Sequence, residues 1–265
     1  MYNFDYQRPG DRAAAAAAVK GGDARFLAGG QTLIQAMKLR LSSSEKLVDL
    51  GGIADLKGIQ VDAGKVTIGA MTTHSAVARS AEVQKAIPAL AELAGGIGDA
   101  MVRNAGTLGG SIANADPAAD YPAAVLGLGA TIQTDRRTIA ADAFFTGMYE
   151  TALQPGELIV SVSFPVPQKA AYMKYKQPAS RFALVGVFVA QTAGGVRVAV
   201  TGAKSSAFRC AELEAALGKS FSAAAAKAVK LSSADMNSDL HGSAEYRAAM
   251  VVVMAARAVE KALAR

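Results

Sequence analysis

The sequence predicts an α+β fold, and three observations lead to this prediction. Over residues 1–167, short apolar runs that end at glycine alternate with stretches whose apolar residues recur at helical spacing. Beyond Pro165 and Pro167 the order changes to consecutive strands followed by helices. Neither an internal repeat nor a low-complexity linker interrupts the chain. We therefore expect two domains, residues 1–167 and residues 168–265.

The first part of the chain predicts a glycine pair between a strand and a helix. We expect an extended lead-in, a helix, a short strand and a second helix at residues 2–9, 11–20, 25–28 and 31–41. Gly29 and Gly30 follow the strand, where a turn into a helix leaves backbone N–H groups free to bind phosphate. The pair is not a P-loop, because no Gly-Lys-Ser/Thr follows it, and it does not match G-x-G-x-x-G.

The remainder of the first part predicts further short strands and one clear helix. We expect strands at residues 46–50, 60–61, 65–69, 131–133, 138–140 and 158–166, a helix at residues 88–97, and turns at residues 62–64 and 135–137. Thr72 and Thr73 stand at a strand end, where their hydroxyl groups either bind a ligand or cap a helix that begins near His74. We interpret His74 as a helix-start residue rather than a catalytic one.

A second glycine-rich stretch covers residues 103–120, RNAGTLGGSIANADPAAD. Successive N–H groups in such a turn can form a concave nest for an anion. Asp116 and Pro117 read as an N-cap followed by a first helical residue. Alone, this stretch is equally compatible with a surface turn before a helix. Because residues 28–32 form a similar glycine turn, we predict that the two stretches bind one anionic ligand together.

The C-terminal part predicts an antiparallel sheet of three strands with three helices. The expected strands are residues 171–176, 182–192 and 196–202, and the expected helices lie near residues 209–217, 223–231 and 244–263.

Composition excludes several classes of protein. Cys210 is the only cysteine, so the chain can hold neither an intramolecular disulfide nor a cysteine-ligated iron–sulfur cluster by itself. Two histidines are too few and too scattered to suggest a zinc site. The net charge of +6 is spread along the chain without an aromatic-interleaved basic cluster, which favours a docking face for a partner protein over nucleic-acid binding.

The hydrophobic pattern also bears on location. No apolar run approaches the roughly 20 residues that a membrane-spanning helix needs. The alanine run at residues 13–18 lacks a cleavage pattern and reads as a helix rather than a signal peptide. We therefore expect a cytoplasmic protein without a membrane span.

Six motifs follow one another over nearly the whole chain: AGGQT (28–32), IGAMTTHSAV (68–77), RNAGTLGGSIANADPAAD (103–120), PGELI (155–159), RFALVGVFVA (181–190) and DLHGSAEYR (239–247). In these motifs and in their order, the sequence resembles the FAD-binding (medium) subunit of the molybdenum hydroxylase family, the carbon monoxide dehydrogenase and xanthine dehydrogenase type. The resemblance implies a vanillyl-alcohol-oxidase-type FAD-binding domain with subdomains at about residues 1–57 and 58–167. A C-terminal flavoprotein domain, residues 168–265, would follow.

The resemblance also implies a set of residues that bind FAD non-covalently. Residues 28–32 would wrap one side of the pyrophosphate and residues 107–111 the other. Asp120 would lie near the ribityl and pyrophosphate region and bind hydroxyl groups. Ile159, or its neighbour Leu158, would lie beside the adenine or flavin ring, and Phe182 aligns near an aromatic residue that covers the flavin. The expected cofactor-binding residues are Ala28, Gly29, Gly30, Gln31, Thr32, Leu33, Thr72, Thr107, Leu108, Gly109, Gly110, Ser111, Asp120 and Ile159. We expect no catalytic residue and no metal ligand in this chain.

The function that the resemblance implies is electron transfer within a complex. Substrate would be hydroxylated at a molybdenum cofactor in a large subunit, and electrons would cross [2Fe–2S] clusters in a small subunit to reach FAD here. The external acceptor would be NAD, a quinone or oxygen, and the complex a dimer of heterotrimers. Two alternatives remain open: a stand-alone FAD-dependent oxidase or reductase, and a binding module whose glycine stretches are only turns.

Overall fold

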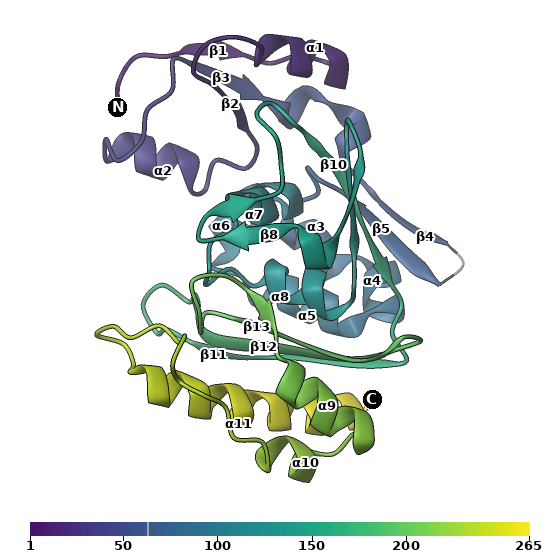
Figure 1. Cartoon of the computed structure of the whole chain (residues 1–265). Coiled ribbons are helices and arrows are strands. Elements are labelled where there is room, and N and C mark those ends of the chain that lie inside the picture. Colours follow the sequence, from purple (N-terminus) through teal and green to yellow (C-terminus); the bar gives the residue numbers. More distant parts are fainter. Residues whose placement is uncertain (63) are drawn as a thin grey trace.

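Three main sheets follow one another along the molecule, from the N-terminal strands to the C-terminal helices (Figure 1). The structure is a computed structural model that describes residues 1–62 and 64–265. The turn expected at residues 62–64 therefore includes one residue, Ala63, that lies outside the described residues.

The N-terminal sheet is parallel, with the strand order β1-β3-β2. Its elements are β1 (Asp5–Gln7), α1 (Arg12–Ala18), β2 (Ala24–Leu27), α2 (Leu33–Lys38), β3 (Lys46–Asp49) and the 3-10 helices η1 (Leu50–Gly52) and η2 (Ala54–Leu56). Helix α1 begins after Asp11, whose side chain accepts the N–H of Ala14 at 2.8 Å. The extended lead-in contains β1, which pairs with β3.

The central sheet is antiparallel, with the strand order β4-β5-β10-β6-β7. Its strands are β4 (Ile59–Asp62), β5 (Lys65–Gly69), β6 (Thr131–Thr134), β7 (Thr138–Ala140) and β10 (Ile159–Pro165). Val66 and Ile68 in β5 and Val162 and Phe164 in β10 are fully buried, because a half-buried strand turns every second side chain to the core.

Short helices pack on this sheet and supply the other half of its core. They are α3 (His74–Arg79), α4 (Ala81–Ala86), α5 (Pro88–Gly95), α6 (Ala100–Ala105), α7 (Leu108–Asn114), α8 (Tyr121–Gly127) and the 3-10 helix η3 (Ala141–Ala143), with a small hairpin of β8 (Phe145–Gly147) and β9 (Glu150–Thr151). Helix α5 has Pro88 at its start and buries Leu90 and Leu93 against the sheet side of the core.

The C-terminal sheet has four strands rather than the three that the sequence predicts. Strands β11 (Lys169–Lys176), β12 (Ala183–Thr192) and β13 (Gly195–Thr201) form the expected antiparallel order, and β14 (Phe208–Arg209) adds an edge. A strand of two residues is too short to show alternation in the sequence. Helices α9 (Ala211–Lys219), α10 (Ala223–Lys227) and α11 (Ala244–Leu263) match the expected order.

Strand β12 is buried on both faces and joins the C-terminal sheet to the first part of the chain. Val187 and Val189 belong to the core beneath α11, whereas Phe188 and Ala190 belong to the core of the central sheet. Helix α11 covers one side of β11 and β12, and α8 packs on β12 and β13 from the other side (Figure 1). The hydrophobic core of the central sheet therefore contains residues from both sides of residue 167, the expected domain boundary.

Within residues 1–62 and 64–265, no helix is long and apolar enough to cross a membrane. The same residues contain no group of three or more His, Cys, Asp or Glu side chains that could hold a metal ion.

Candidate cofactor-binding site

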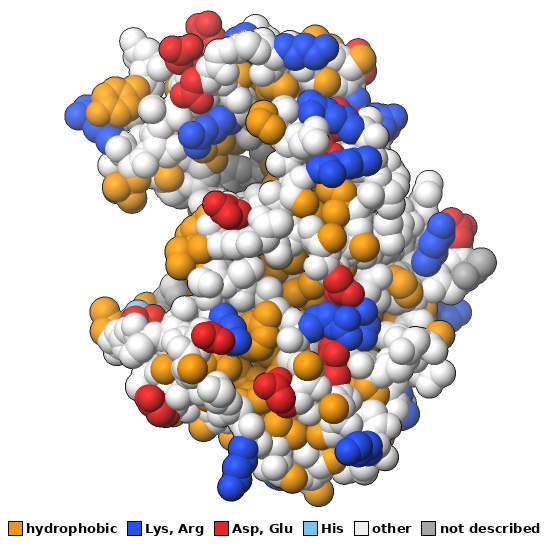
Figure 2. All heavy atoms as spheres, in the orientation of Figure 1, with side chains coloured by type: hydrophobic (Ala, Val, Ile, Leu, Met, Phe, Trp, Pro, Cys, Tyr) orange, Lys and Arg blue, Asp and Glu red, His pale blue; other side chains and the backbone are white. Residues whose placement is uncertain are grey.

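A cavity of about 480 Å³ lies between the N-terminal sheet and the rest of the molecule. Figure 2 shows the surface hollowed between the upper part of the molecule and the part below it. The cavity walls come from the β2–α2 turn, helix α7, the start of β10 and the turn between β11 and β12. Both glycine stretches of the sequence therefore face one cavity. Among the predicted cofactor-binding residues, all except Thr72 and Leu108 line it.

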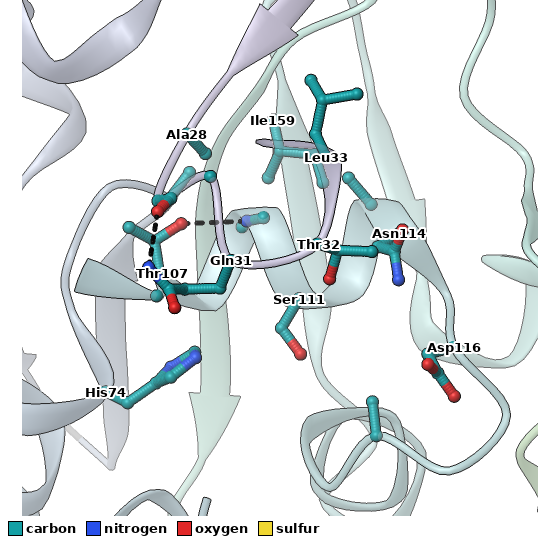
Figure 3. A pocket seen from close by; sticks show the side chains of 18 of the residues that line it. Ala28, Gln31, Thr32, Leu33, His74, Thr107, Ser111, Asn114, Asp116 and Ile159 are labelled. Carbon is teal, nitrogen blue, oxygen red and sulfur yellow. Dashed lines mark hydrogen bonds between the residues drawn. The ribbon is translucent and has the colours of Figure 1, made fainter. Parts of the chain in front are cut away.

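The β2–α2 turn presents free backbone donors to the cavity. Within the described part of the chain, none of the N–H groups of residues 29–33 donates a hydrogen bond to the protein, and Thr32 precedes α2 without a side-chain cap. Gly30 adopts a left-handed conformation with φ of 67°, which turns the chain between strand and helix. The Gln31 amide Nε2 donates to Gly29 O at 3.2 Å and closes the turn (Figure 3). This run of free N–H groups is a nest suited to an anion.

The second glycine stretch is not the open loop that the sequence predicts. Gly109 and Gly110 lie inside helix α7, and the N–H of Gly110 donates to Thr107 Oγ1 at 3.1 Å. The N–H groups of Leu108 and Gly109 donate to Thr72 O at 3.1 Å and to Ala70 O at 2.8 Å. The prediction of an anion nest at this stretch is therefore wrong, because the N–H groups of Leu108, Gly109 and Gly110 already donate to other atoms of the protein.

The glycines of α7 instead allow close packing around the cavity. A Cβ on Gly109 would lie 2.6 Å from the Cβ of Ala70, and a Cβ on Gly110 would lie 3.2 Å from that of Ala28. A larger side chain at either position would push the helix away from the segments that it contacts. Helix α7 therefore lies close enough to the β2–α2 turn to share one cavity with it.

Hydroxyl and amide groups on α7 and the facing turn complete the polar lining. The side chains of Thr32, Ser111 and Asn114 form no hydrogen bond among the described residues, and all three line the cavity (Figure 3). Sequence reasoning missed Asn114. Its position three residues after Ser111 in a helix places both on one face, which was the available signal.

Asp116 and Pro117 do not begin a helix, and this prediction was wrong. Asp116 Oδ1 accepts the N–H of Ala118 at 2.8 Å, so the Asp-Pro pair forms a turn that a side chain closes. Helix α8 begins four residues later, with Asp120 at its N-cap position and Pro122 in its first turn. The sequence did not distinguish the two structures, because aspartate favours both a helix N-cap and an Asx turn, in which its side chain accepts the N–H two residues later.

Asp120 lines the cavity but is held by the C-terminal sheet. Its Oδ1 accepts the hydroxyl of Tyr172 at 2.6 Å, and its Oδ2 pairs with the Lys174 ammonium at 2.9 Å. Burial raises the pKa of Asp120, while Lys174 and Tyr172 act in the opposite direction. The charge of this carboxylate is therefore compensated within the protein.

Thr72 and Leu108 lie behind the cavity wall. The Thr72 hydroxyl donates to Gly58 O and accepts the N–H of Gly58, both at 3.0 Å. Thr73, its neighbour, caps α3 by accepting the N–H of Ala76 at 3.2 Å. The open alternative between ligand and cap is thus resolved for Thr73 in favour of the cap, and the Thr72 hydroxyl is already used.

Apolar side chains form the remaining walls. Leu158 and Ile159 both line the cavity, as does Phe182, whose exposed fraction is 46%. Phe26 and Leu158 belong to the hydrophobic cluster of the N-terminal part, whereas Ile97 and Val102 line the cavity with the β11–β12 turn. The cavity therefore offers apolar surface for flat rings besides the anion nest.

Glu157 fixes the segment that carries Leu158 and Ile159. Its carboxylate accepts Arg137 Nε at 2.9 Å and Nη2 at 3.0 Å, the hydroxyl of Thr134 at 2.8 Å and the N–H of Gln154 at 2.7 Å. The Arg137 guanidinium is the largest cause that lowers the pKa of Glu157 to about 2.

We predict that Glu157→Gln lowers the free energy of unfolding by about 2 kcal/mol at neutral pH, because charge-assisted hydrogen bonds are lost. The folded pKa lies below the ordinary value of 4.5, so the stabilisation is present above pH 4.5 and is lost as the pH falls toward 2. Urea unfolding of both proteins over this acid range measures the difference. A gap that stays constant with pH would contradict the assignment.

The comparisons with known proteins agree with this geometry. A cavity with free N–H groups and apolar walls suits a dinucleotide-like cofactor. Residues 2–167, more than half of the chain, match the family described as the FAD binding domain in molybdopterin dehydrogenase. The chain belongs to this family, and the relatives that cover nearly all of it include proteins named carbon monoxide dehydrogenase medium chain.

Three relatives show how far the similarity extends. The carbon monoxide dehydrogenase medium chain of Hydrogenophaga pseudoflava is 36% identical over 280 residues, covering 99% of this chain and 98% of that protein. The nicotine 6-hydroxylase medium subunit of Paenarthrobacter nicotinovorans is 34% identical over 257 residues, covering 92% and 91%. The crystal structure of quinoline 2-oxidoreductase from Pseudomonas putida 86 matches with a TM-score of 0.90 and 30% identity, covering 98% of this chain and 97% of that one.

Proposed function

We propose that this chain binds FAD non-covalently in the cavity and transfers electrons as the medium subunit of a molybdenum hydroxylase complex. The observation that carries the proposal is the run of free N–H groups at residues 29–33, which faces the cavity in a chain of this family. FAD supplies the redox chemistry when it is bound, since a flavin exchanges electrons singly or in pairs. The protein supplies position and electrostatics.

The pyrophosphate group is proposed to lie against the β2–α2 turn. Free N–H groups of residues 29–33 would donate to its oxygens, and the hydroxyl groups of Thr32 and Ser111 would add two donors. Gly109 and Gly110 would contribute by close packing, and Leu108 and Thr72 by holding α7 in place. Lys174 compensates the Asp120 carboxylate, so that Asp120 can face ribityl hydroxyl groups without repelling the phosphates.

The flavin and adenine rings are proposed to lie on the apolar walls. Leu158 and Ile159 would contact one ring, and Phe182 would lie beside the other. Apolar side chains that cover a flat ring in this way exclude water from it, and the buried apolar surface adds to the binding free energy that the backbone N–H groups supply.

The domain division and the complex are further parts of the proposal. We propose a vanillyl-alcohol-oxidase-type FAD-binding domain at residues 1–167, with subdomains at about 1–57 and 58–167, and a flavoprotein domain at residues 168–265. Sheets confined to residues 5–49, 59–165 and 169–209 support these limits. We also propose a cytoplasmic location, which rests on the sequence analysis alone and which cell fractionation tests.

The names of the relatives support a proposal about partner subunits. We propose a small [2Fe–2S] subunit, a large molybdenum subunit and a dimer of such heterotrimers, with NAD, a quinone or oxygen as the acceptor. The relatives are named for carbon monoxide dehydrogenase, nicotine 6-hydroxylase and quinoline 2-oxidoreductase. Because similar medium subunits serve different substrates, the substrate site is expected in another chain.

We predict that the purified chain binds one FAD per molecule and releases it intact on denaturation. Flavin absorbance of the protein, and of the supernatant after acid precipitation, measures both. A colourless protein that takes up no added FAD would sink the proposal. Turnover of a small substrate by the isolated chain would instead favour the alternative of a stand-alone oxidase or reductase.

A further inference from the structure

His74 lies at a junction between three segments that surround the cavity. It is the first residue of α3, and its backbone N–H donates to Gly106 O at 3.0 Å. Its ring packs beside that of Tyr121, with centroids 5.3 Å apart and planes tilted by 49°. A Cβ on Gly106 would lie 2.6 Å from His74 Nε2, so the glycine leaves room for the ring. The orientation of the imidazole is therefore fixed by packing on several sides.

Neither ring nitrogen of this imidazole has a hydrogen-bond partner among residues 1–62 and 64–265. His74 is only 4% exposed, and its Nδ1 is buried without a hydrogen bond among the described residues. Its Nε2 also makes no hydrogen bond there. A polar atom that loses water without gaining a partner costs about 1–3 kcal/mol, so a ligand that covers Nε2 is expected to offer it a hydrogen bond.

The cavity does not reach the buried Nδ1, but His74 lines it, and Nε2 is the ring nitrogen that is not among the fully buried atoms. Figure 3 shows the ring directed toward the space beneath Gln31 and beside Ser111. A partner from outside the chain can therefore reach the imidazole edge. A hydrophobic residue would fill the same volume at lower cost if the position served packing alone.

The charge state of His74 restricts which group it can bind. Burial is the main cause, and Arg103 the second, that lowers the pKa of His74 to about 4. The imidazole is therefore neutral near neutral pH and offers one donor and one acceptor. A neutral ring suits an uncharged polar edge better than a phosphate, which the N–H groups of residues 29–33 already match.

The composition of the cavity walls also favours an uncharged ligand group at His74. Ile97, Val102 and Phe182 line the cavity with apolar surface, and the Arg181 guanidinium donates to Gly98 O at 3.4 Å in the same region. Apolar walls that include a neutral imidazole fit a flat heterocycle and its attached hydroxyl groups.

We propose that His74 is a positioning residue that hydrogen-bonds the flavin–ribityl half of FAD through Nε2. The inference rests on the proposed function, since it assumes FAD in this cavity. It goes beyond that function because it assigns a role to a residue that the sequence predicts only as a helix start.

The first test compares FAD with ADP, which contains the pyrophosphate and adenosine but no flavin. Isothermal titration of the full chain is expected to give an FAD dissociation constant about tenfold higher for His74→Leu, with ADP binding unchanged within about twofold. His74→Gln, whose amide nitrogen reaches as far as Nε2, is expected to recover most of the FAD affinity. Tyr121→Phe is the matched control and should bind both ligands normally, because Tyr121 does not line the cavity.

The second test needs no variant. In 15N-labelled wild-type protein, the His74 ring nitrogen signals are expected to shift on addition of FAD but not of ADP. His241, the only other histidine, lies in an exposed turn and serves as the internal reference.

The outcomes separate the two proposals. A wild-type chain that binds no FAD removes the proposed function and this inference together. Normal FAD binding by His74→Leu, an equal loss of FAD and ADP binding, or unshifted His74 signals in the FAD-loaded wild type would each overturn the inference alone.

Discussion

Gly29→Ala is expected to raise the FAD dissociation constant at least about a hundredfold, which corresponds to about 2.7 kcal/mol. A Cβ at this position would overlap the carbonyl oxygen of Ala105 and lie 2.7 Å from the Cα of Gly106. Both obstacles are backbone atoms, which cannot rotate away as a side-chain tip can. The β2–α2 turn must therefore move, and the N–H groups of residues 29–33 move with it.

The fold itself should survive the change. Overpacking of this kind costs about 1–3 kcal/mol of stability, less than the total stability of a typical domain. Titration calorimetry with FAD and circular dichroism with urea measure the two effects on the same protein. The matched control is Gly10→Ala, because nothing among the described residues lies within 4 Å of a Cβ there.

Two results would count against this account. If folded Gly29→Ala protein binds FAD as tightly as the wild type, the β2–α2 turn is only a connection between strand and helix. If Gly10→Ala loses FAD as well, the loss reports a general sensitivity of the chain to added methyl groups.

The β2–α2 turn was predictable because its signals are local. An apolar run, two glycines and a helical spacing of leucine and isoleucine follow one another within residues 25–41. The structure keeps this order, although α2 covers only Leu33–Lys38. The free N–H groups then follow from the unpaired donors of any such turn.

Helix α7 was not predictable because its causes are distant in sequence. Glycine is a poor helix former, so Gly109 and Gly110 favour a loop in any local interpretation. Thr72 O and Ala70 O accept the first N–H groups of the helix, and glycine stands at position 109 because Ala70 leaves no room for a Cβ there. These contacts join segments more than thirty residues apart, which a local pattern cannot report.

The partners of Asp120 show the same limit. Family resemblance places this aspartate at the cofactor, and the structure places it in the cavity lining. Lys174 and Tyr172 come from β11, 54 and 52 residues away, and nothing in the sequence pairs them with Asp120. The compensation of its charge is therefore a property of the folded chain alone.

Lys174→Met is expected to lower the free energy of unfolding by about 3–5 kcal/mol near neutral pH, because it leaves a buried carboxylate without its cation. The side chains of Asp120 and Lys174 are 5% and 10% exposed, so water screens the pair little. Lys174 Nζ also donates to Gly96 O at 3.3 Å, and this contact is lost as well. Urea unfolding compared with the wild type measures the change.

The pH dependence of the stability lost in Lys174→Met tests whether the charge of Asp120 causes the loss. Burial raises the pKa of Asp120 in the folded protein above its ordinary value of 3.8, and Lys174 opposes this rise. A raised folded pKa means that the stabilising contribution is present below the unfolded value and is lost as the pH rises through the folded value. Removing Lys174 raises the folded pKa further. The deficit of Lys174→Met should therefore shrink as the pH is lowered toward 3.8 and widen toward neutral pH.

A double variant separates the buried charge from the lost packing. Asp120→Asn removes the carboxylate charge, so the combined Asp120→Asn, Lys174→Met protein should regain at least about 2 kcal/mol relative to Lys174→Met alone at neutral pH. Its deficit should no longer vary with pH in the range where Asp120 titrates. If the double variant is as unstable as the sum of the single ones, Lys174 stabilises the sheet by its contacts rather than through Asp120. The C-terminal sheet would then have no electrostatic link to the cavity.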